Sequence, residues 1–326
     1  MKYPETPMNP ELAGLMGKMK DLGLGAVDVT TVDLSFARAE LAKQYAYLNQ
    51  EPIQVSEVEV GTFNFEGESI RVRCYLPKLS TDQSTWGIYL HGGGWTFGDE
   101  DTHDGVARAF CAASQMPLAS IGYSLAPGKK FPFQNKQIAH VIQELVEIFQ
   151  SELPTSSDPV KLILIGDSAG ANLALSVYQD YLNEKTRSQV VGMVLYYAVL
   201  SANTNLDSWN RLGDGRYGLS TKAMNWYWDQ FLENSTQKTL PQVSTIDSNN
   251  KMLPPMWLLV GNLDPLLDDT LNFAEKLKVE RIAHEVHVLE GYPHGFLRFC
   301  KQLDGVNQII QKSGVAMQQM KNGSFK

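Results

Sequence analysis

The chain has 326 residues, of which 43% are hydrophobic and 20% are charged, a balance that is ordinary for a globular protein and does not favour disorder. Its formal net charge of -8 argues against nucleic acid as the main partner and suits an uncharged small-molecule substrate. Cys74, Cys111 and Cys300 are odd in number and far apart, which supports neither a disulfide framework nor a zinc knuckle and predicts buried free thiols.

The first residues lack the apolar core that is typical of a signal peptide, and no run of about 18 apolar residues occurs anywhere in the chain. We therefore expect a cytoplasmic protein that does not enter a membrane.

Residues 1–51 have the spacing of amphipathic helices. Apolar residues recur three or four positions apart, first at Leu12, Leu15, Met16 and Met19 and then at Ala37, Leu41, Tyr45 and Leu48. Two interpretations fit this pattern equally well, a pair of helices packed on the core or a roof over an active site, because spacing does not say what an apolar face covers.

The next part of the chain alternates strands with helices. Strand-like runs cover 55–63, 69–75, 87–90, 118–123, 161–165, 190–195, 256–260 and 285–289, and helical stretches such as 140–149 and 171–182 separate most of the later ones. This alternation predicts an α/β protein with a mostly parallel central sheet and helices on both faces.

Residues 201–253 interrupt the alternation with a polar stretch, and Trp226, Tyr227 and Trp228 lie there in a predicted helix. No linker or repeat divides the chain. We expect one domain, 1–326, whose helical cap comes from about 1–50 and about 201–253.

The strongest motif is Gly166-Asp-Ser168-Ala-Gly170, which lies between an apolar strand and a helical segment. A turn this tight requires small neighbours, holds the serine in a strained conformation and projects its hydroxyl outward. The N-terminus of the helix that follows favours negative charge beside it. We therefore predict that Ser168 is a catalytic nucleophile.

A glycine loop, His91-Gly-Gly-Gly-Trp95, follows another predicted strand. Consecutive glycines allow backbone shapes that expose amide hydrogens. The loop predicts an oxyanion hole formed by the amides of Gly92 and Gly93 with that of Ala169. The spacing does not complete a phosphate-binding motif, which argues against a nucleotide site. We expect His91 to support the loop.

Two further predicted strands each end in a candidate catalytic residue. Asp264 follows the strand 256–260, and its rivals Asp268 and Asp269 fall in the first turn of the next helix, where acidic residues are expected for the dipole alone. His294 lies in a loop beyond the strand 285–289. The chain order serine, aspartate, histidine is the one expected for an α/β hydrolase.

Taken together, these residues resemble the hormone-sensitive-lipase-like family of α/β-hydrolase esterases, and especially its bacterial acetyl esterases. The resemblance begins near residue 55 and rests on 91–95, Gly98-Asp-Glu-Asp-Thr-His-Asp104, 166–170, Asp264-Pro-Leu-Leu-Asp-Asp269 and His294-Gly-Phe296. It implies an α/β-hydrolase fold with a cap, a triad of Ser168, Asp264 and His294, and Asp167 as a supporting acid. It also implies short acyl substrates, no cofactor and, in some members, a homodimer.

The sequence thus predicts a serine esterase that hydrolyses short-chain, acetyl-like esters through an acyl-enzyme. We expect Trp95, Trp226 and Trp228 to contact the substrate and, together with Phe97, to set the depth of the pocket, although the alternative that these aromatic residues belong to the core stays open. An amidase or deacetylase with the same triad is an alternative that the sequence leaves open. A non-catalytic binding protein is a further alternative, and the presence of all three triad residues argues against it.

Overall fold

The computed structural model describes residues 5–154, 158–248 and 252–326 of the chain. The predicted cap ranges 1–50 and 201–253 therefore include two short stretches, 1–4 and 249–251, that lie outside the described residues.

One eight-stranded sheet forms the centre of the molecule, in the order β1-β2-β4-β3-β5-β6-β7-β8. The first two strands run antiparallel to their neighbours, and all the other pairs are parallel. The strands are β1 (Glu57–Phe65), β2 (Glu68–Leu76), β3 (Thr85–Leu90), β4 (Leu118–Gly122), β5 (Lys161–Asp167), β6 (Val190–Tyr196), β7 (Met256–Gly261) and β8 (His284–Leu289).

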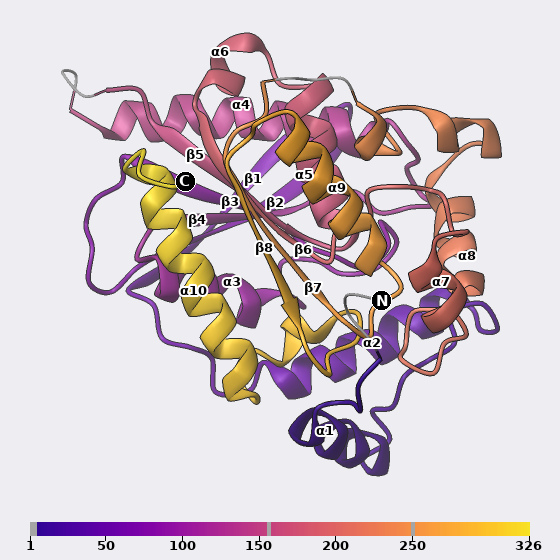
Figure 1. Cartoon of the computed structure of the whole chain (residues 1–326). Coiled ribbons are helices and arrows are strands. Elements are labelled where there is room, and N and C mark those ends of the chain that lie inside the picture. The colour runs from indigo at the N-terminus through magenta and orange to yellow at the C-terminus, as the bar shows by residue number, and fades with distance from the viewer. Residues whose placement is uncertain (1–4, 155–157, 249–251) are drawn as a thin grey trace.

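Helices cover both faces of this sheet (Figure 1). One face packs against α4, α5 and α9, and the other packs against α3 and α10. The α-helices are α1 (Pro10–Asp21), α2 (Leu34–Leu48), α3 (Asp104–Ser114), α4 (Phe133–Glu152), α5 (Ala169–Asp180), α6 (Glu184–Ser188), α7 (Asp207–Leu212), α8 (Thr221–Phe231), α9 (Leu267–Val279) and α10 (Asp304–Lys321). Short 3-10 turns are η1 (Ser235–Thr239), η2 (Thr245–Asp247) and η3 (Phe296–Phe299).

The central strands are buried on both faces because their side chains alternate between two apolar cores. In β5, Leu162 and Leu164 join the core under α4 and α5, whereas Ile163 and Ile165 join the core under α3 and α10. This explains why the sequence shows short continuous apolar runs rather than an alternation of apolar and polar residues. The predicted α/β architecture with a mostly parallel central sheet is confirmed.

All eight predicted strands are present, with boundaries that differ by at most two residues at either end. The prediction of buried free thiols is confirmed for Cys111 and Cys300, whereas Cys74 is free but only half-buried. The helix predicted from His140 begins earlier, at Phe133, because the chain turns into it directly after Pro132.

The N-terminal segment and the insertion after β6 lie close together. Glu5 forms an ion pair with Arg216, and Asp28, in the loop between α1 and α2, lies 3.8 Å from the Nζ of Lys222 at the start of α8. Figure 1 shows α1 and α2 in indigo and purple below the sheet, with α7 and α8 beside them. No helix within the described ranges is long and apolar enough to cross a membrane.

Candidate active site

Ser168 occupies the turn between β5 and α5. Its φ of 53° and ψ of -120° lie in the left-handed half of backbone space, which costs a non-glycine residue about 1–3 kcal/mol. The amide of Ser168 donates to the carbonyl oxygen of Tyr196 at 2.9 Å, and this bond ties the turn to the neighbouring strand β6. The strand-to-helix turn predicted for this serine is therefore the turn that the chain forms.

Three side chains from three strand ends form a continuous hydrogen-bonded relay. Ser168 Oγ lies 2.9 Å from His294 Nε2, and His294 Nδ1 lies 2.8 Å from Asp264 Oδ2. Asp264 is fully buried, and its other oxygen accepts the amide hydrogen of Leu266 at 2.9 Å. The hydroxyl, the imidazole and the carboxylate thus have the geometry that acyl transfer requires.

The two rival carboxylates bond elsewhere. Asp268 Oδ2 accepts the amide hydrogen of Ser208 at 2.8 Å, and Asp269 Oδ1 accepts those of Leu200 and Ser201 at 3.2 and 2.8 Å. Burial raises the pKa of Asp269 to about 8. Both residues therefore anchor the start of the insertion, and within the described residues Asp264 is the carboxylate that bonds His294.

The glycine loop differs in one respect from its prediction. The amide of Gly92 donates to Asp167 Oδ1 at 2.9 Å, so it is already engaged and does not face the pocket. The amides of Gly93 and Gly94 have no acceptor among the described residues, and both residues line the pocket. Ala169 is the first residue of α5, and its N–H has no intrahelical partner. The amides that remain open are therefore those of Gly93, Gly94 and Ala169. The predicted oxyanion hole is corrected accordingly, because Gly94 takes the place of Gly92.

Glycine is required at the first two open positions for steric reasons. Gly93 has a φ of +115°, and a Cβ there would lie 2.2 Å from the carbonyl oxygen of Phe97. At Gly94, whose φ is +59°, a Cβ would lie 2.2 Å from the ring of Tyr227. The loop can expose its amides only because neither residue carries a side chain.

Asp167 joins the glycine loop to the serine turn. Besides the Gly92 amide it accepts the hydroxyl hydrogens of Tyr89 at 2.7 Å and Tyr197 at 3.3 Å. Burial raises the pKa of this carboxyl, while the bond from Tyr89 acts in the opposite direction. Asp167 therefore holds the two halves of the site at a constant separation.

His91 is buried beneath the loop. Its Nδ1 lies 2.8 Å from the carbonyl oxygen of Gly92, its ring stacks on Tyr123 with centroids 4.2 Å apart, and Tyr123 donates its hydroxyl to the His91 carbonyl at 2.7 Å. Burial lowers the pKa of His91 to about 4, so the ring is neutral near pH 7. These contacts place His91 in a supporting position, away from Ser168 Oγ.

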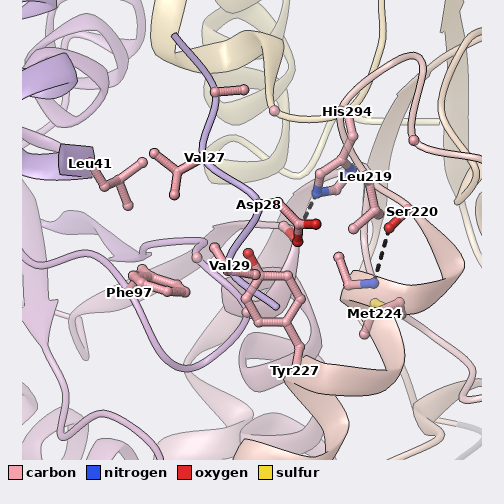
Figure 2. A pocket seen from close by; sticks show the side chains of 18 of the residues that line it. Val27, Asp28, Val29, Leu41, Phe97, Leu219, Ser220, Met224, Tyr227 and His294 are labelled. Carbon is pink, nitrogen blue, oxygen red and sulfur yellow. Dashed lines mark hydrogen bonds between the residues drawn. The ribbon is translucent and has the colours of Figure 1, made fainter. Parts of the chain in front are cut away.

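The relay opens into a pocket of about 740 Å³. Figure 2 shows Val27, Leu41 and Phe97 on one side of it and His294, Leu219, Ser220 and Met224 on the other, with Tyr227 between them. The lining comes from the core, from the N-terminal segment and from the insertion after β6.

None of the three predicted tryptophans lines this pocket. Trp95 and Trp228 are fully buried with ring centroids 4.4 Å apart, and Trp95 stacks on Phe231 at 4.5 Å, so both belong to the apolar core. Trp226 is half-buried, with its ring 6.1 Å from that of Phe97. Phe97 and Tyr227 supply the aromatic wall instead, which corrects the assignment of Trp95, Trp226 and Trp228 to the substrate.

Sequence reasoning missed two residues of the site. Tyr197 directly follows β6, and its ring meets His294 edge-on with centroids 4.8 Å apart. Its place at the carboxyl end of a parallel strand is a signal that could have identified it. Arg298 also lines the pocket, from the short turn η3, and no pattern in the sequence distinguishes it from a surface arginine.

Comparison with known families shows one match, a model described as the alpha/beta hydrolase fold, which covers residues 87–298. The match begins within β3 and spans β4 to β8, the glycine loop, the serine turn and both other relay residues, and it confirms the predicted α/β-hydrolase fold.

Similar proteins were found among characterised sequences and solved structures. An ethyl acetate hydrolase of Pseudomonas putida is 26% identical over 96% of this chain and 99% of its own length. A carboxylesterase of Mycobacterium tuberculosis is 29% identical over 74% of this chain and 76% of its own. The structure of a hyperthermophilic esterase from the archaeon Pyrobaculum calidifontis matches with a TM-score of 0.85 and 25% identity, over 97% of this chain and 99% of that one.

Proposed function

This chain belongs to the α/β-hydrolase family, among the hormone-sensitive-lipase-like esterases that its motifs resemble, and we propose that it is a serine carboxylesterase for short-chain, acetyl-like esters. The observation that carries the proposal is the relay from Ser168 through His294 to Asp264, with spacings of 2.9 and 2.8 Å, at the floor of a pocket.

The first half of the reaction forms an acyl-enzyme. His294 Nε2 takes the proton of Ser168 Oγ while that oxygen attacks the ester carbonyl carbon, and Asp264 stabilises the imidazolium that results. The tetrahedral intermediate then collapses, the bond to the alcohol oxygen breaks, and His294 returns its proton to the departing alkoxide. The acyl group remains on Ser168.

The negative oxygen of the intermediate is bound by the amides of Gly93, Gly94 and Ala169. Each donor of this kind lowers the barrier by roughly 3 kcal/mol when its position is preorganised. Preorganisation is supplied by Asp167, which fixes the glycine loop to the serine turn before the substrate arrives.

The second half of the reaction releases the acid. A water molecule loses a proton to His294 Nε2 and attacks the acyl carbon, and the new intermediate expels Ser168 Oγ, which recovers the proton. One water is consumed and the free enzyme is regenerated.

The two segments beside the pocket act as its cap, and they consist of the described parts of 1–50 and 201–253. Residues from both, such as Val27 and Leu219, line the pocket, and the ion pairs of Glu5 and Asp28 connect them. We expect this cap and Phe97 to limit the acyl chain. The small ester named for the Pseudomonas putida relative supports the same preference.

Ser168→Ala tests the chemistry. Turnover of 4-nitrophenyl acetate should fall by about 10⁴- to 10⁶-fold while the thermal unfolding curve is retained, because the hydroxyl acts only as nucleophile. Ser151→Ala, at the exposed end of α4, is the matched control and should leave the rate unchanged. An organophosphate should label the native protein on Ser168. Undiminished activity of Ser168→Ala would exclude this mechanism.

Substrate class is tested with 4-nitrophenyl esters of increasing acyl length, for which kcat/KM should be highest at the shortest chains. A preference for chains longer than about eight carbons would contradict the short-acyl proposal. Comparison of 4-nitrophenyl acetate with 4-nitroacetanilide separates an esterase from an amidase, because the two share the acetyl group and differ in the leaving atom.

A further inference from the structure

Arg298 is a cation in the pocket that has no counter-charge among the described residues. It belongs to η3, four residues beyond His294, and lines the same pocket as Ser168. Within residues 5–154, 158–248 and 252–326 its guanidinium makes no hydrogen bond and no ion pair, and its Nε is buried without an acceptor. Its Cζ lies 4.7 Å from the centroid of the Phe299 ring.

The other charges that line the pocket are paired. Arg216 contacts both Glu5 and Asp214, at 3.0 and 2.6 Å, and Lys222 contacts Asp28 at 3.8 Å. Asp167 is satisfied by a backbone amide and two tyrosine hydroxyls. Among the described lysines and arginines of the lining, Arg298 is thus the one whose charge is left without a counter-charge.

The guanidinium lies near an aromatic part of the pocket. Burial raises the pKa of Tyr227 to about 12 and raises that of Tyr45, and in both cases the positive charge of Arg298 opposes the rise. Tyr45, Tyr227 and His103 line the pocket, and His103 lies 3.3 Å from the hydroxyl of Tyr45. These neighbours are neutral, so none of them neutralises the arginine.

A half-buried guanidinium with no acceptor has lost part of its hydration, and the ring of Phe299 replaces neither a hydrogen-bond acceptor nor a counter-charge. Carboxylates match the planar fork of arginine, and the bond is stronger where water is partly excluded. A ligand carboxylate would supply the missing acceptor and the missing charge together.

We propose that the substrate of this enzyme is an ester that carries a carboxylate, which Arg298 binds while Ser168 attacks the ester carbonyl. This inference rests on the proposed esterase function and narrows its substrate class to anionic esters. The carboxylate belongs either to the acyl part, as in a half-ester of a dicarboxylic acid, or to the alcohol part, as in an acylated hydroxy acid.

The native enzyme provides the first test. Release of acid is followed for monoethyl glutarate, which carries the carboxylate on the acyl side, and for 3-acetoxypropanoate, which carries it on the alcohol side, each beside its neutral amide. For one pair kcat/KM should be about ten- to hundredfold higher for the carboxylate than for the amide. That pair shows whether the carboxylate belongs to the acyl part or to the alcohol part of the ester. If both neutral amides react as fast as the carboxylates or faster, the assignment of Arg298 is wrong.

Arg298→Gln tests the residue itself. The ratio of kcat/KM for carboxylate over amide should fall to about one, mainly through KM, and Arg298→Lys should restore part of it. Arg281→Gln, at an exposed turn outside the pocket, removes the same charge and should keep the native ratio. An unchanged ratio in Arg298→Gln would overturn the proposal.

The outcomes separate this inference from the proposed function. Hydrolysis of 4-nitrophenyl acetate by the native enzyme without any carboxylate preference removes the role of Arg298 and leaves the esterase intact. If the native enzyme hydrolyses none of these esters and an organophosphate does not label Ser168, both the role of Arg298 and the proposed esterase function are wrong. If Arg298→Gln does not fold, the native ratios still decide the matter.

Discussion

The floor of the pocket and its cap are held by different kinds of contact. The floor consists of the glycine loop, the serine turn and the loops that carry Asp264 and His294, and it is built on sheet ends with buried hydrogen bonds. The proposed cap consists of the described parts of 1–50 and 201–253, and exposed ion pairs such as Glu5–Arg216 and Asp28–Lys222 join its two segments.

Buried hydrogen bonds that leave an unsatisfied group when broken are costly to remove, whereas exposed ion pairs are screened by water and salt. The floor should therefore tolerate few substitutions, whereas the exposed contacts between the two cap segments should tolerate many. Chemistry requires fixed atoms, and substrate choice can vary on a surface that is held more loosely.

The largest expected effect is on the floor. Asp264→Asn should lower kcat for 4-nitrophenyl acetate by about 10³- to 10⁴-fold, because an amide no longer stabilises the imidazolium or selects the tautomer of His294. Asp268 accepts the amide hydrogen of Ser208 at the start of the insertion, so Asp268→Asn should lower kcat by less than about tenfold. A larger loss at Asp268 than at Asp264 would show that the acid has been assigned to the wrong residue.

The next largest effect is expected at Phe97, whose ring lines the pocket between its floor and its cap. Phe97→Ala should increase kcat/KM for a six-carbon ester relative to the acetate by about tenfold, because it removes an aromatic ring from the pocket lining. Trp228→Phe should instead leave the chain-length profile unchanged and lower stability by about 1–3 kcal/mol, because Trp228 packs in the core. Thermal unfolding and the ester series together distinguish the two, and a changed profile in Trp228→Phe would return that tryptophan to the substrate site.

Asp269 lies where the floor meets the cap, and it should make the stability of the protein depend on pH. The pKa of Asp269 is raised to about 8 in the folded chain, against an ordinary value of about 4. Between these values the unfolded chain releases the proton and the folded chain keeps it, so the free energy of unfolding falls as pH rises through this window.

Asp269→Asn removes that dependence and can still accept the amide hydrogens of Leu200 and Ser201. Its midpoint of thermal unfolding should equal that of the native protein near pH 4 and exceed it by about 3 °C or more near pH 8. Exposed Asp229→Asn is the control and should follow the native curve. A gain that is the same at both pH values would argue that Asp269 is ionised in the folded protein.

The smallest effect is expected in the cap. Lys222→Gln breaks the contact with Asp28, whose atoms are 3.8 Å apart and exposed, and should change KM for 4-nitrophenyl acetate by less than about twofold with kcat unchanged. Raising the salt concentration should have the same slight effect on the native enzyme. A change in KM of more than about fivefold would show that the cap is held as firmly as the floor.

Much of the floor could be predicted from local sequence. Strand ends, small residues at a turn and consecutive glycines are properties of a few neighbouring residues, so the sheet and the meeting place of Ser168, Asp264 and His294 follow from pattern and chain order. The cap was expected as two segments, but its position over the pocket could not be derived, because an amphipathic helix does not identify what it covers.

Only the tertiary structure decided the contacts between distant segments. The amide of Gly92 is occupied because Asp167, 75 residues later, reaches it, and Trp95 and Trp228 are core residues because Phe231 and their own rings fill that space. Arg298 stands in the pocket without a counter-charge although nothing in its sequence context sets it apart. Hydrogen bonds and charges are assigned to partners only after the elements have packed, whereas the identity and chain order of the reacting groups are already present in the sequence.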